Sequence, residues 1–245
     1  MNNRTNTDAL DGLLLVDKPA GMTSHDVVHA IRRHFGIRKV GHGGTLDPAA
    51  TGLLMILLGR GTKLSAQVMS SDKTYEGIML LGTTTDSQDM DGEIVREADC
   101  SNVTAEQISA EMQKRTGDIM QTPPMVSAVK KDGVPLYKLA RKGVTVEREA
   151  RLIHIYSFKL LSHEPPRAQF RIKCTKGTYV RTLCHDIGEA LGCGACLESL
   201  RRTQSGAYSA DRALKLDNLL KLSRSELEPH VIPFLQVKQD EKILC

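Results

Sequence analysis

One stretch of this sequence, VGHGGTLDPAATGLLMILLG at residues 40–59, strongly restricts what the backbone can do. Its glycines at 41, 43 and 44 permit positive φ and close approach of another backbone, whereas Pro48 fixes its own φ and restricts Asp47 before it. The apolar run at residues 53–58 indicates a buried strand. The sequence therefore predicts a rigid loop that presents one imidazole, His42, and one carboxylate, Asp47. An Asp-Pro pair by itself is most often only a turn, so its function has to be argued from other residues.

Chain length sets the scale of the fold. At 245 residues the chain forms one large domain or two small ones. A chain of this size buries roughly 70–75% of its extended surface, so it needs neither a disulfide nor a metal to fold. Apolar content of 40% and charged content of 25% are ordinary for a soluble globular protein.

The N-terminus and the cysteines indicate a cytoplasmic protein. Residues 1–12 are polar without the apolar core of a signal peptide, and no apolar run approaches the ~20 residues of a membrane span. The six cysteines are then interpreted as reduced thiols, with Cys174 and Cys184 in the core. Cys193 and Cys196 form a CxxC motif with no second pair, so no metal site is expected.

Charge is unevenly spread along a mildly basic chain of net charge +4 and pI ≈ 8.7. Residues 28–75 and 130–151 are basic, and the segment between them, residues 76–118, is acidic. Two basic blocks around an acidic one favour a charged face that binds a polyanion. A solvated surface of mixed sign is the alternative.

Apolar periodicity predicts an α+β protein with a mixed, largely antiparallel sheet flanked by helices and loops. A helix is predicted from the cap Thr23-Ser24 to a stop at Gly36, and another from the capping box Thr104-x-x-Gln107 to about Arg115. Further helices are expected at residues 62–69, 136–142 and 178–191. Strands are expected at 13–16, 53–58, 73–81, 151–162, 167–174 and 197–204, and a strand with a hairpin at 126–133. Beyond Ala213 only weak helical patterns remain.

Several familiar motifs fail. The glycines around His42 lack the Lys-Ser/Thr of a Walker loop and the third glycine of a dinucleotide loop, and no GxSxG occurs. The polar loop at residues 83–92 resembles a calcium loop, but Ala98 stands where the bidentate glutamate should be, so calcium is rejected.

A second short motif, KGTYVR at residues 176–181, places Tyr179 and Arg181 at the mouth of a helix. A single carboxylate with a guanidinium partner suits nucleophilic chemistry at a sugar carbon, since the cation keeps the acid ionised. Tyr75 can serve as a platform for a flat ring. Taken singly, Arg181 can equally be a surface ion pair and the two tyrosines half-buried packing residues.

Together these motifs resemble the TruB family of tRNA pseudouridine synthases. The similarity runs in order from about residue 12 to 210, and the glycine-histidine-aspartate block is highly specific. It is carried by LVDKP-x-G-x-TS at residues 15–24, GHGGTLDPAATG at 41–52, KTY at 73–75, QTPP at 121–124, KGTYVRTL at 176–183 and LRR at 200–202. The resemblance implies the pseudouridine synthase fold and isomerisation of uridine 55 in the tRNA T-loop, with no cofactor or metal.

The resemblance also implies roles for individual residues. Asp47 is then the catalytic aspartate and Arg181 its ion-pair partner. Tyr75 stacks on the flipped uracil, and Tyr179 lies beside the base near its carbon 5.

Other matched residues are implied to bind the substrate or support the loop. His42 contributes to the tRNA contact that keeps the T-loop splayed, and Leu200 lines the substrate pocket. Lys18 and Pro19 brace the loop from below. Asp89 matches a family acid in the substrate-facing polar loop.

The expected organisation is a flexible tail at residues 1–11, a catalytic domain at 12–210 and a short helical extension at 211–245. Bacterial members usually carry a C-terminal RNA-binding module of the PUA type, for which the extension is too short, so weaker tRNA binding is expected. Val126 stands where relatives often have an aromatic residue before Ser127-Ala128, a difference expected to affect packing more than catalysis. A monomer is expected, without a membrane contact or a small-molecule cofactor. The alternatives are a tRNA-binding or tRNA-folding protein with little catalysis, and a base-excising glycosidase.

Overall fold

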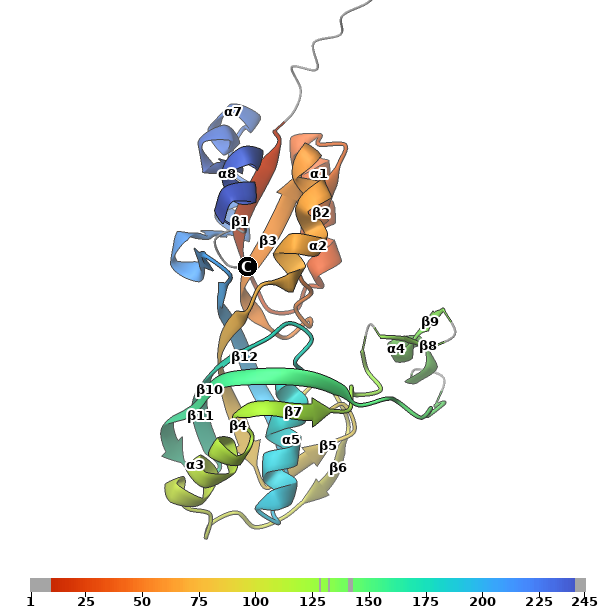
Figure 1. Ribbon diagram of the computed structural model, residues 1–245, viewed down its shortest axis with the longest axis vertical. Helices are drawn as coiled ribbons and strands as arrows, with labels where there is room; N and C mark the ends of the chain where they lie inside the picture. The colour runs from red at the N-terminus through yellow and green to blue at the C-terminus, as the bar shows by residue number, and fades with distance from the viewer. Residues whose placement is uncertain (1–9, 128, 132, 141–142, 241–245) are drawn as a thin grey trace, which may run out of the picture. The chain divides into compact units, whose positions relative to one another are not determined.

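The computed structural model describes residues 10–127, 129–131, 133–140 and 143–240, and it divides into two compact units. Unit 1 is made of residues 1–73 and 201–245, and unit 2 of residues 74–200. Figure 1 shows the elements along the chain. The predicted flexible tail falls mainly on residues 1–9, which lie outside the described residues.

The strands are β1 Gly12–Lys18, β2 Val40–His42, β3 Thr51–Leu58, β4 Lys73–Leu81, β5 Thr83–Thr85, β6 Ile94–Glu97, β7 Gly117–Gln121, β8 Lys130–Lys131, β9 Val134–Pro135, β10 Arg151–Glu164, β11 Arg167–Cys174, β12 Ala195–Ser205, β13 Tyr208–Ser209, β14 Leu214–Lys215 and β15 Val231–Pro233. The α-helices are α1 Ser24–Phe35, α2 Ser65–Ser70, α3 Ala105–Lys114, α4 Leu136–Ala140, α5 Val180–Ala190, α6 Leu216–Leu219, α7 Arg224–Leu227 and α8 Phe234–Asp240. Short 3₁₀ helices cover Gly59–Leu64, Ala210–Arg212 and Glu228–His230.

Most of the strands belong to an eleven-stranded sheet. Eight of them follow the order β14-β1-β3-β12-β4-β11-β10-β7, and the other three, β13, β15 and β2, pair with β12, β1 and β3 respectively. β1 pairs antiparallel with β3, and β10 pairs antiparallel with both β11 and β7. Parallel pairing joins β1 to β14 and β12 to β3. This mixed sheet with its helices confirms the predicted α+β class.

In unit 1 the apolar run of the opening stretch forms β3, where every side chain from Leu53 to Leu58 is buried. Such complete burial fits a strand covered on both faces. β1 is buried with it, and Leu15 lies opposite Met55 in the ladder. Tyr208 and Val237, from far along the sequence, complete this core.

Helix α1 forms as its sequence predicts. Thr23 caps it by accepting a hydrogen bond from the backbone N–H of Asp26, whose carboxylate bonds back to Thr23. The apolar face, with Ile31 and Phe35 among its residues, is buried. Gly36 ends the helix in the left-handed region at φ 63°.

In unit 2 the long strands β10 and β11 form an antiparallel pair, as predicted. Alternate residues of β11, such as Phe170 and Ile172, are buried and those between them exposed. Helices α3 and α5 contribute Ile108, Met112 and Leu183 to the same core. Cys174 and Cys184 are both buried, so their predicted core positions are confirmed.

The structure corrects several predicted elements. The segment beyond Ala213 contains the short helices α6, α7 and α8, in agreement with the weak helical patterns predicted there, but also β14 and β15, which were not predicted and pair with β1. Residues 126–127 are not in a strand, and the hairpin is formed by β8 and β9. The helix predicted at 62–69 begins as a 3₁₀ turn at Gly59. The strands β8, β9, β14 and β15 have only two or three residues, too short to show a period, which explains why they were not located from the sequence. The predicted end of the helix at residues 141–142 lies outside the described residues.

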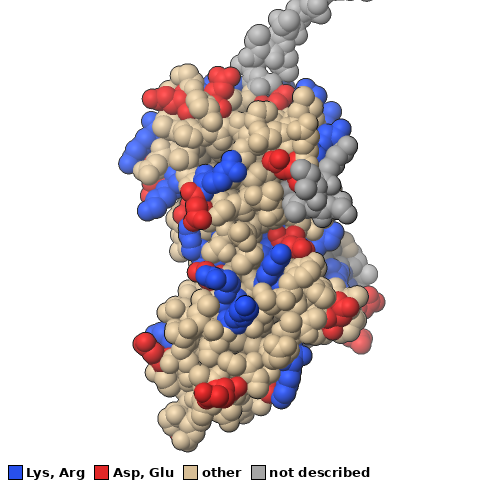
Figure 2. All heavy atoms as spheres, turned by 60° about the vertical axis from the view of Figure 1, so that its left-hand side comes forward, with Lys and Arg blue, Asp and Glu red and all other residues tan. Residues whose placement is uncertain are grey.

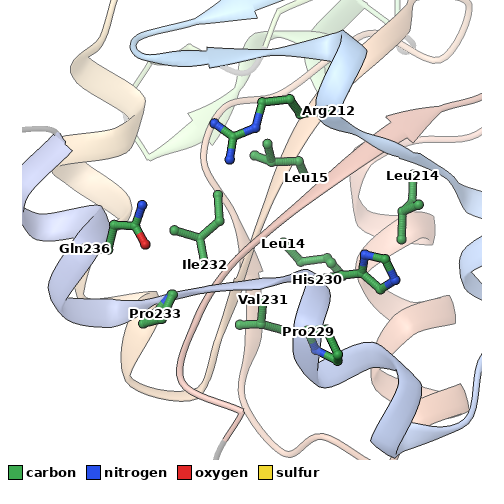
Figure 3. Close-up of a pocket in the computed structure, with 10 residues that line it drawn as sticks. All are labelled: Leu14, Leu15, Arg212, Leu214, Pro229, His230, Val231, Ile232, Pro233 and Gln236. Atoms are coloured by element: carbon green, nitrogen blue, oxygen red, sulfur yellow. The ribbon is translucent and has the colours of Figure 1, made fainter.

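β14 and β15 leave a gap along the edge of β1, because β15 pairs with residues 12–14 and β14 with residues 16–17. A pocket of about 300 Å³ opens there (Figure 3). Apolar side chains of β1, β14 and β15 form most of its wall, and Arg212, His230 and Gln236 are its polar side chains.

Among the described helices, none is long and apolar enough to cross a membrane.

The close parallel contact between β3 and β12 leads to a prediction about the free energy of unfolding. Gly52 has φ +95°, and a Cβ added there would lie 2.4 Å from the backbone oxygen of Arg202. Gly21 has φ +82° but open space around it. We expect Gly21→Ala to cost about 1–2 kcal/mol of unfolding free energy through backbone strain alone, and Gly52→Ala to cost at least ~2 kcal/mol more because backbone must move. Urea unfolding of both variants measures the difference, and equal losses would contradict this packing.

Candidate active site

The residues predicted to act together belong to different units. Unit 1 contains Lys18, His42 and Asp47. Unit 2 contains the remainder of the predicted set: Tyr75, Asp89, Tyr179, Arg181 and Leu200. The predicted ion pair of Asp47 with Arg181 stays a prediction, because its two members belong to different units.

Asp47 is half-buried on a loop that the backbone and Ser24 hold at several points. Its carbonyl accepts a hydrogen bond from the N–H of Ala50 at 3.1 Å, and the carbonyl of Pro48 accepts one from Gly21 at 2.9 Å. The buried hydroxyl of Ser24 accepts a hydrogen bond from the N–H of Leu46 at 2.9 Å. These bonds on both sides of the aspartate give the rigidity that the sequence predicted.

Lys18 is fully buried beneath this loop. Its ammonium group donates to the carbonyls of Pro19 at 2.9 Å, Met22 at 2.6 Å and Pro48 at 3.0 Å. Burial lowers the pKa of Lys18 to about 8, and the nearby Asp47 carboxylate acts in the opposite direction. Lys18 therefore connects the end of β1 to the residue that follows Asp47.

Arg202 is a second buried cation under the same loop. It was not among the site residues predicted from the sequence. Its Nε donates to the carbonyl of Leu53 at 2.7 Å, while the Nη atoms donate to Gly44 at 3.1 Å and Thr45 at 3.4 Å. The sequence held one signal, its place in the LRR motif. Ser24 was likewise noticed only as part of a helix cap.

His42 ends β2 and immediately precedes the same loop. Its ring meets that of His25 edge to face, with centroids 5.8 Å apart. Burial, together with the positive charges of His25 and Arg202, lowers the pKa of His42 below its usual value. The imidazole is therefore neutral at pH 7, when it can donate one hydrogen bond and accept another.

In unit 2, Arg181 is buried and its Nη1 lies 2.9 Å from Oδ2 of Asp89. The other oxygen of Asp89 accepts hydrogen bonds from the Ser87 hydroxyl and the N–H of Asp91. Arg181 also donates to the carbonyl of Val126. A buried pair with these additional bonds fixes the guanidinium, so the alternative of a surface ion pair is wrong.

Tyr179 occupies the N-cap position of α5, with the Arg181 guanidinium 5.9 Å from the centre of its ring. The buried amide of Gln121 accepts from the N–H of Tyr179 at 2.8 Å and donates to its carbonyl at 3.0 Å. This two-point contact fixes the backbone from which the ring projects. Tyr75 and Leu200 are half-buried against the unit 2 core.

These arrangements supply a carboxylate on a stiff loop above two buried cations, and a guanidinium oriented by an acid beside an aromatic ring. Among the described residues, no group of three or more His, Cys, Asp or Glu side chains is placed to hold a metal ion.

Comparison with solved structures defines the class of protein. The chain aligns with a chain of a Cbf5-Nop10-Gar1 complex with a TM-score of 0.74 at 29% identity, covering 94% of this chain and 62% of that one. An archaeal Nop10-Cbf5 complex aligns with a TM-score of 0.68 at 28% identity, covering 92% and 60%. The chain thus spans less than two thirds of those proteins. The chain therefore shares its fold with a chain of each of these complexes.

The particular family follows from sequence. Residues 32–180 match the TruB family pseudouridylate synthase N-terminal domain, and residues 181–235 match the tRNA pseudouridylate synthase B C-terminal domain. This chain therefore belongs to the TruB family, whose members are isomerases. It is 52% identical over 227 residues to tRNA pseudouridine synthase B of Opitutus terrae, covering 93% of this chain and 94% of that protein. The corresponding protein of Syntrophotalea carbinolica is 49% identical, with 91% and 72% covered.

The lowered pKa of Lys18 leads to a prediction about how isomerase activity changes with pH. Below about pH 8 the ammonium group has three donors for its three carbonyls, and above it the neutral amine has two. We expect isomerase activity to fall as pH rises through about 8. In Lys18→Met this limb should be absent and activity lower throughout. Lys215→Met, on exposed β14, should keep the native profile, and an unchanged alkaline limb in Lys18→Met would refute the assignment.

The buried Asp89–Arg181 pair gives a second prediction. Asp89→Asn removes the charge that holds the guanidinium, so we expect kcat to fall roughly 10- to 100-fold through misplacement of Arg181, with little change in KM. The exposed neighbour Asp91 provides the matched control, and Asp91→Asn should stay within about twofold of the native rate. Steady-state kinetics of both variants is the measurement. Native kcat in Asp89→Asn would mean that the pair does not matter for the reaction.

Proposed function

We propose that this chain converts uridine 55 in the T-loop of tRNA to pseudouridine. The observation that carries the proposal is the 52% identity to a tRNA pseudouridine synthase B over nearly the full length of both chains. The intact Asp47 loop and the buried Arg181–Asp89 pair support it. A tRNA substrate makes the cytoplasm the natural location.

The reaction breaks the bond between ring nitrogen 1 and the ribose, turns the uracil, and joins carbon 5 to the same sugar carbon. Carbon 5 loses its proton and nitrogen 1 gains one, so the product is an isomer of the substrate. A stacked base is out of reach of side chains, so the uridine is flipped out at a cost of a few kcal/mol. In the proposal an aromatic face, that of Tyr75, then holds the extruded ring.

Asp47 is the proposed catalytic residue. Three roles fit a carboxylate at this position: attack on the anomeric carbon, addition to the ring, or removal of a sugar proton. Each requires the ionised acid, which the cations Lys18 and Arg202 beneath the loop favour. The proposed partner Arg181 acts in the same direction.

The unit 2 residues have different proposed roles. Tyr179 lies beside the base near its carbon 5, and Leu200 lines the substrate pocket. Asp89, which the sequence resemblance placed among substrate contacts, uses both carboxylate oxygens in bonds within its own unit. We assign it the role of a positioning residue for Arg181.

Binding of the RNA backbone is proposed to use the basic side chains of the two basic blocks. On the face shown in Figure 2, Lys and Arg side chains gather in several groups with Asp and Glu beside them. Mixed charge of this kind favours a limited number of phosphate contacts. Binding should therefore weaken with salt. His42 is proposed to contribute to holding the T-loop splayed.

One assay separates the isomerase from the other two candidate functions. Purified protein is incubated with unmodified tRNA carrying tritium at carbon 5 of uridine. Release of tritium with the strand intact supports the isomerase, because carbon 5 must lose its hydrogen. Free uracil would indicate a glycosidase instead. Binding with neither product would indicate a tRNA-folding protein.

The same assay tests the assignment of Asp47. We expect Asp47→Asn to lower the single-turnover rate by at least ~10³-fold, equivalent to about 4 kcal/mol of barrier, because an amide can neither attack nor accept a proton. The dissociation constant for tRNA should change little. Asp217→Asn, an exposed change on α6, serves as the control. A near-native rate in Asp47→Asn would refute the proposed role.

A further inference from the structure

The guanidinium of Arg202 has an unusual environment for a buried charge. The side chain is 1% exposed, and its hydrogen bonds within the described part of the chain all go to backbone carbonyls. A buried cation without a carboxylate is costly unless oriented dipoles replace its hydration. The three carbonyls of Gly44, Thr45 and Leu53 supply those dipoles, so the loop and the cation stabilise each other.

The positions of these carbonyls relate Arg202 to Asp47. Gly44 and Thr45 immediately precede the Leu46-Asp47 pair, and Leu53 lies in β3, the buried strand that follows the loop. Lys18 contacts the carbonyl of Pro48, on the other side of the aspartate. Two buried cations thus hold the loop on both sides of the catalytic carboxylate.

The backbone around Arg202 is fixed as well. Residues Arg201 and Arg202 pair with Thr51 and Gly52 of β3, so the guanidinium starts from a rigid strand. At Gly44 φ is +118°, a backbone conformation that favours glycine, and Nη1 of Arg202 lies within ordinary contact distance of this residue.

We propose that Arg202 is a positioning residue for Asp47: it holds the catalytic loop through three carbonyls, and its buried charge favours the ionised carboxylate. This inference rests on the proposed function, in which Asp47 reacts with the uridine. It adds a residue of the buried underside, distant in sequence, to the groups on which the reaction depends.

The electrostatic part of the inference is supported by the neighbours of Arg202. Its charge lowers the pKa of both Lys18 and His42, after burial and, for each, one other neighbour. A cation that disfavours protonation of two bases from this position also disfavours protonation of an acid on the same loop. Removing the charge should therefore move both limbs of the pH–rate profile to higher pH.

The test compares Arg202→Met, Arg202→Lys and the control Arg201→Met. Arg201 precedes Arg202 on the same strand, but its partly exposed side chain pairs with Asp17 instead of the loop. For each protein we measure the single-turnover rate, the dissociation constant for unmodified tRNA, the melting temperature and the pH–rate profile. Methylguanidine is also added to Arg202→Ala.

We expect Arg202→Met to lower the single-turnover rate about 100-fold, with tRNA affinity within about threefold and both pH limbs shifted upward. Arg202→Lys keeps the charge but cannot span three carbonyls, so its rate should fall while its pH limbs stay in place. Methylguanidine should restore part of the rate of Arg202→Ala. Arg201→Met should behave like the native protein. If Arg202→Met does not fold, the lysine variant and the methylguanidine rescue carry the test.

A native single-turnover rate in folded Arg202→Met or in Arg202→Lys would overturn the inference. A lower melting temperature with an unchanged pH profile and no rescue would also overturn it, since Arg202 would then matter only for stability. An equal rate loss in Arg201→Met would assign the effect to the strand and not to the guanidinium. Asp47→Asn is measured alongside: an active Asp47→Asn refutes the proposed function, whereas an inactive one with native Arg202 variants refutes only this inference.

Discussion

Carbonyl groups of the loop around Asp47 accept hydrogen bonds from two buried cations, Lys18 and Arg202. The strands of unit 1 place both cations beneath the loop. Lys18 emerges from the end of β1 and Arg202 from β12, strands that pair on either side of β3. Burying one ammonium and one guanidinium is costly. Loop carbonyls directed inward offset part of this cost. A change in loop conformation would remove the hydrogen bonds of Lys18 to Pro48 and of Arg202 to Gly44 and Thr45, which favours the present conformation.

Unit 2 also buries a cation, but a carboxylate compensates its charge. Arg181 is fixed by a carboxylate, Asp89, whose remaining oxygen is occupied by Ser87 and the backbone of Asp91. Here the buried charges compensate one another, and a hydroxyl and backbone groups satisfy the remaining bonds. Unit 1 therefore presents an acid on a loop that cations hold, and unit 2 presents a cation that an acid holds. Such preorganisation lowers the reorganisation needed when charge develops during reaction.

Much of this fold was predictable where the physical signal is local. The capping boxes at Thr23 and Thr104 correctly located α1 and α3, and alternation correctly located β11. Strands that depend on distant partners, such as β14 and β15, carry no local period and were missed. The stiff loop at Asp47 followed from glycine and proline chemistry. The resemblance implied that Lys18 braces this loop, and its hydrogen bond to the carbonyl of Pro48 is consistent with that role. Arg202 was not singled out, because it lies 149 residues or more from the carbonyls it contacts. The Arg181–Asp89 pair, separated by 92 residues, was hidden for the same reason.

Unit 1 is assembled from both ends of the sequence, with all of unit 2 inserted between them. β15 pairs with β1, and the hydroxyl of Tyr208 donates to Asp240 on α8. Asp47 follows Lys18 and precedes Arg202 in the sequence, so the two buried cations that hold its loop come from opposite sides of it along the chain. Contacts of large sequence separation form slowly. During folding we therefore expect the Lys18 side of the loop to be fixed before the Arg202 side.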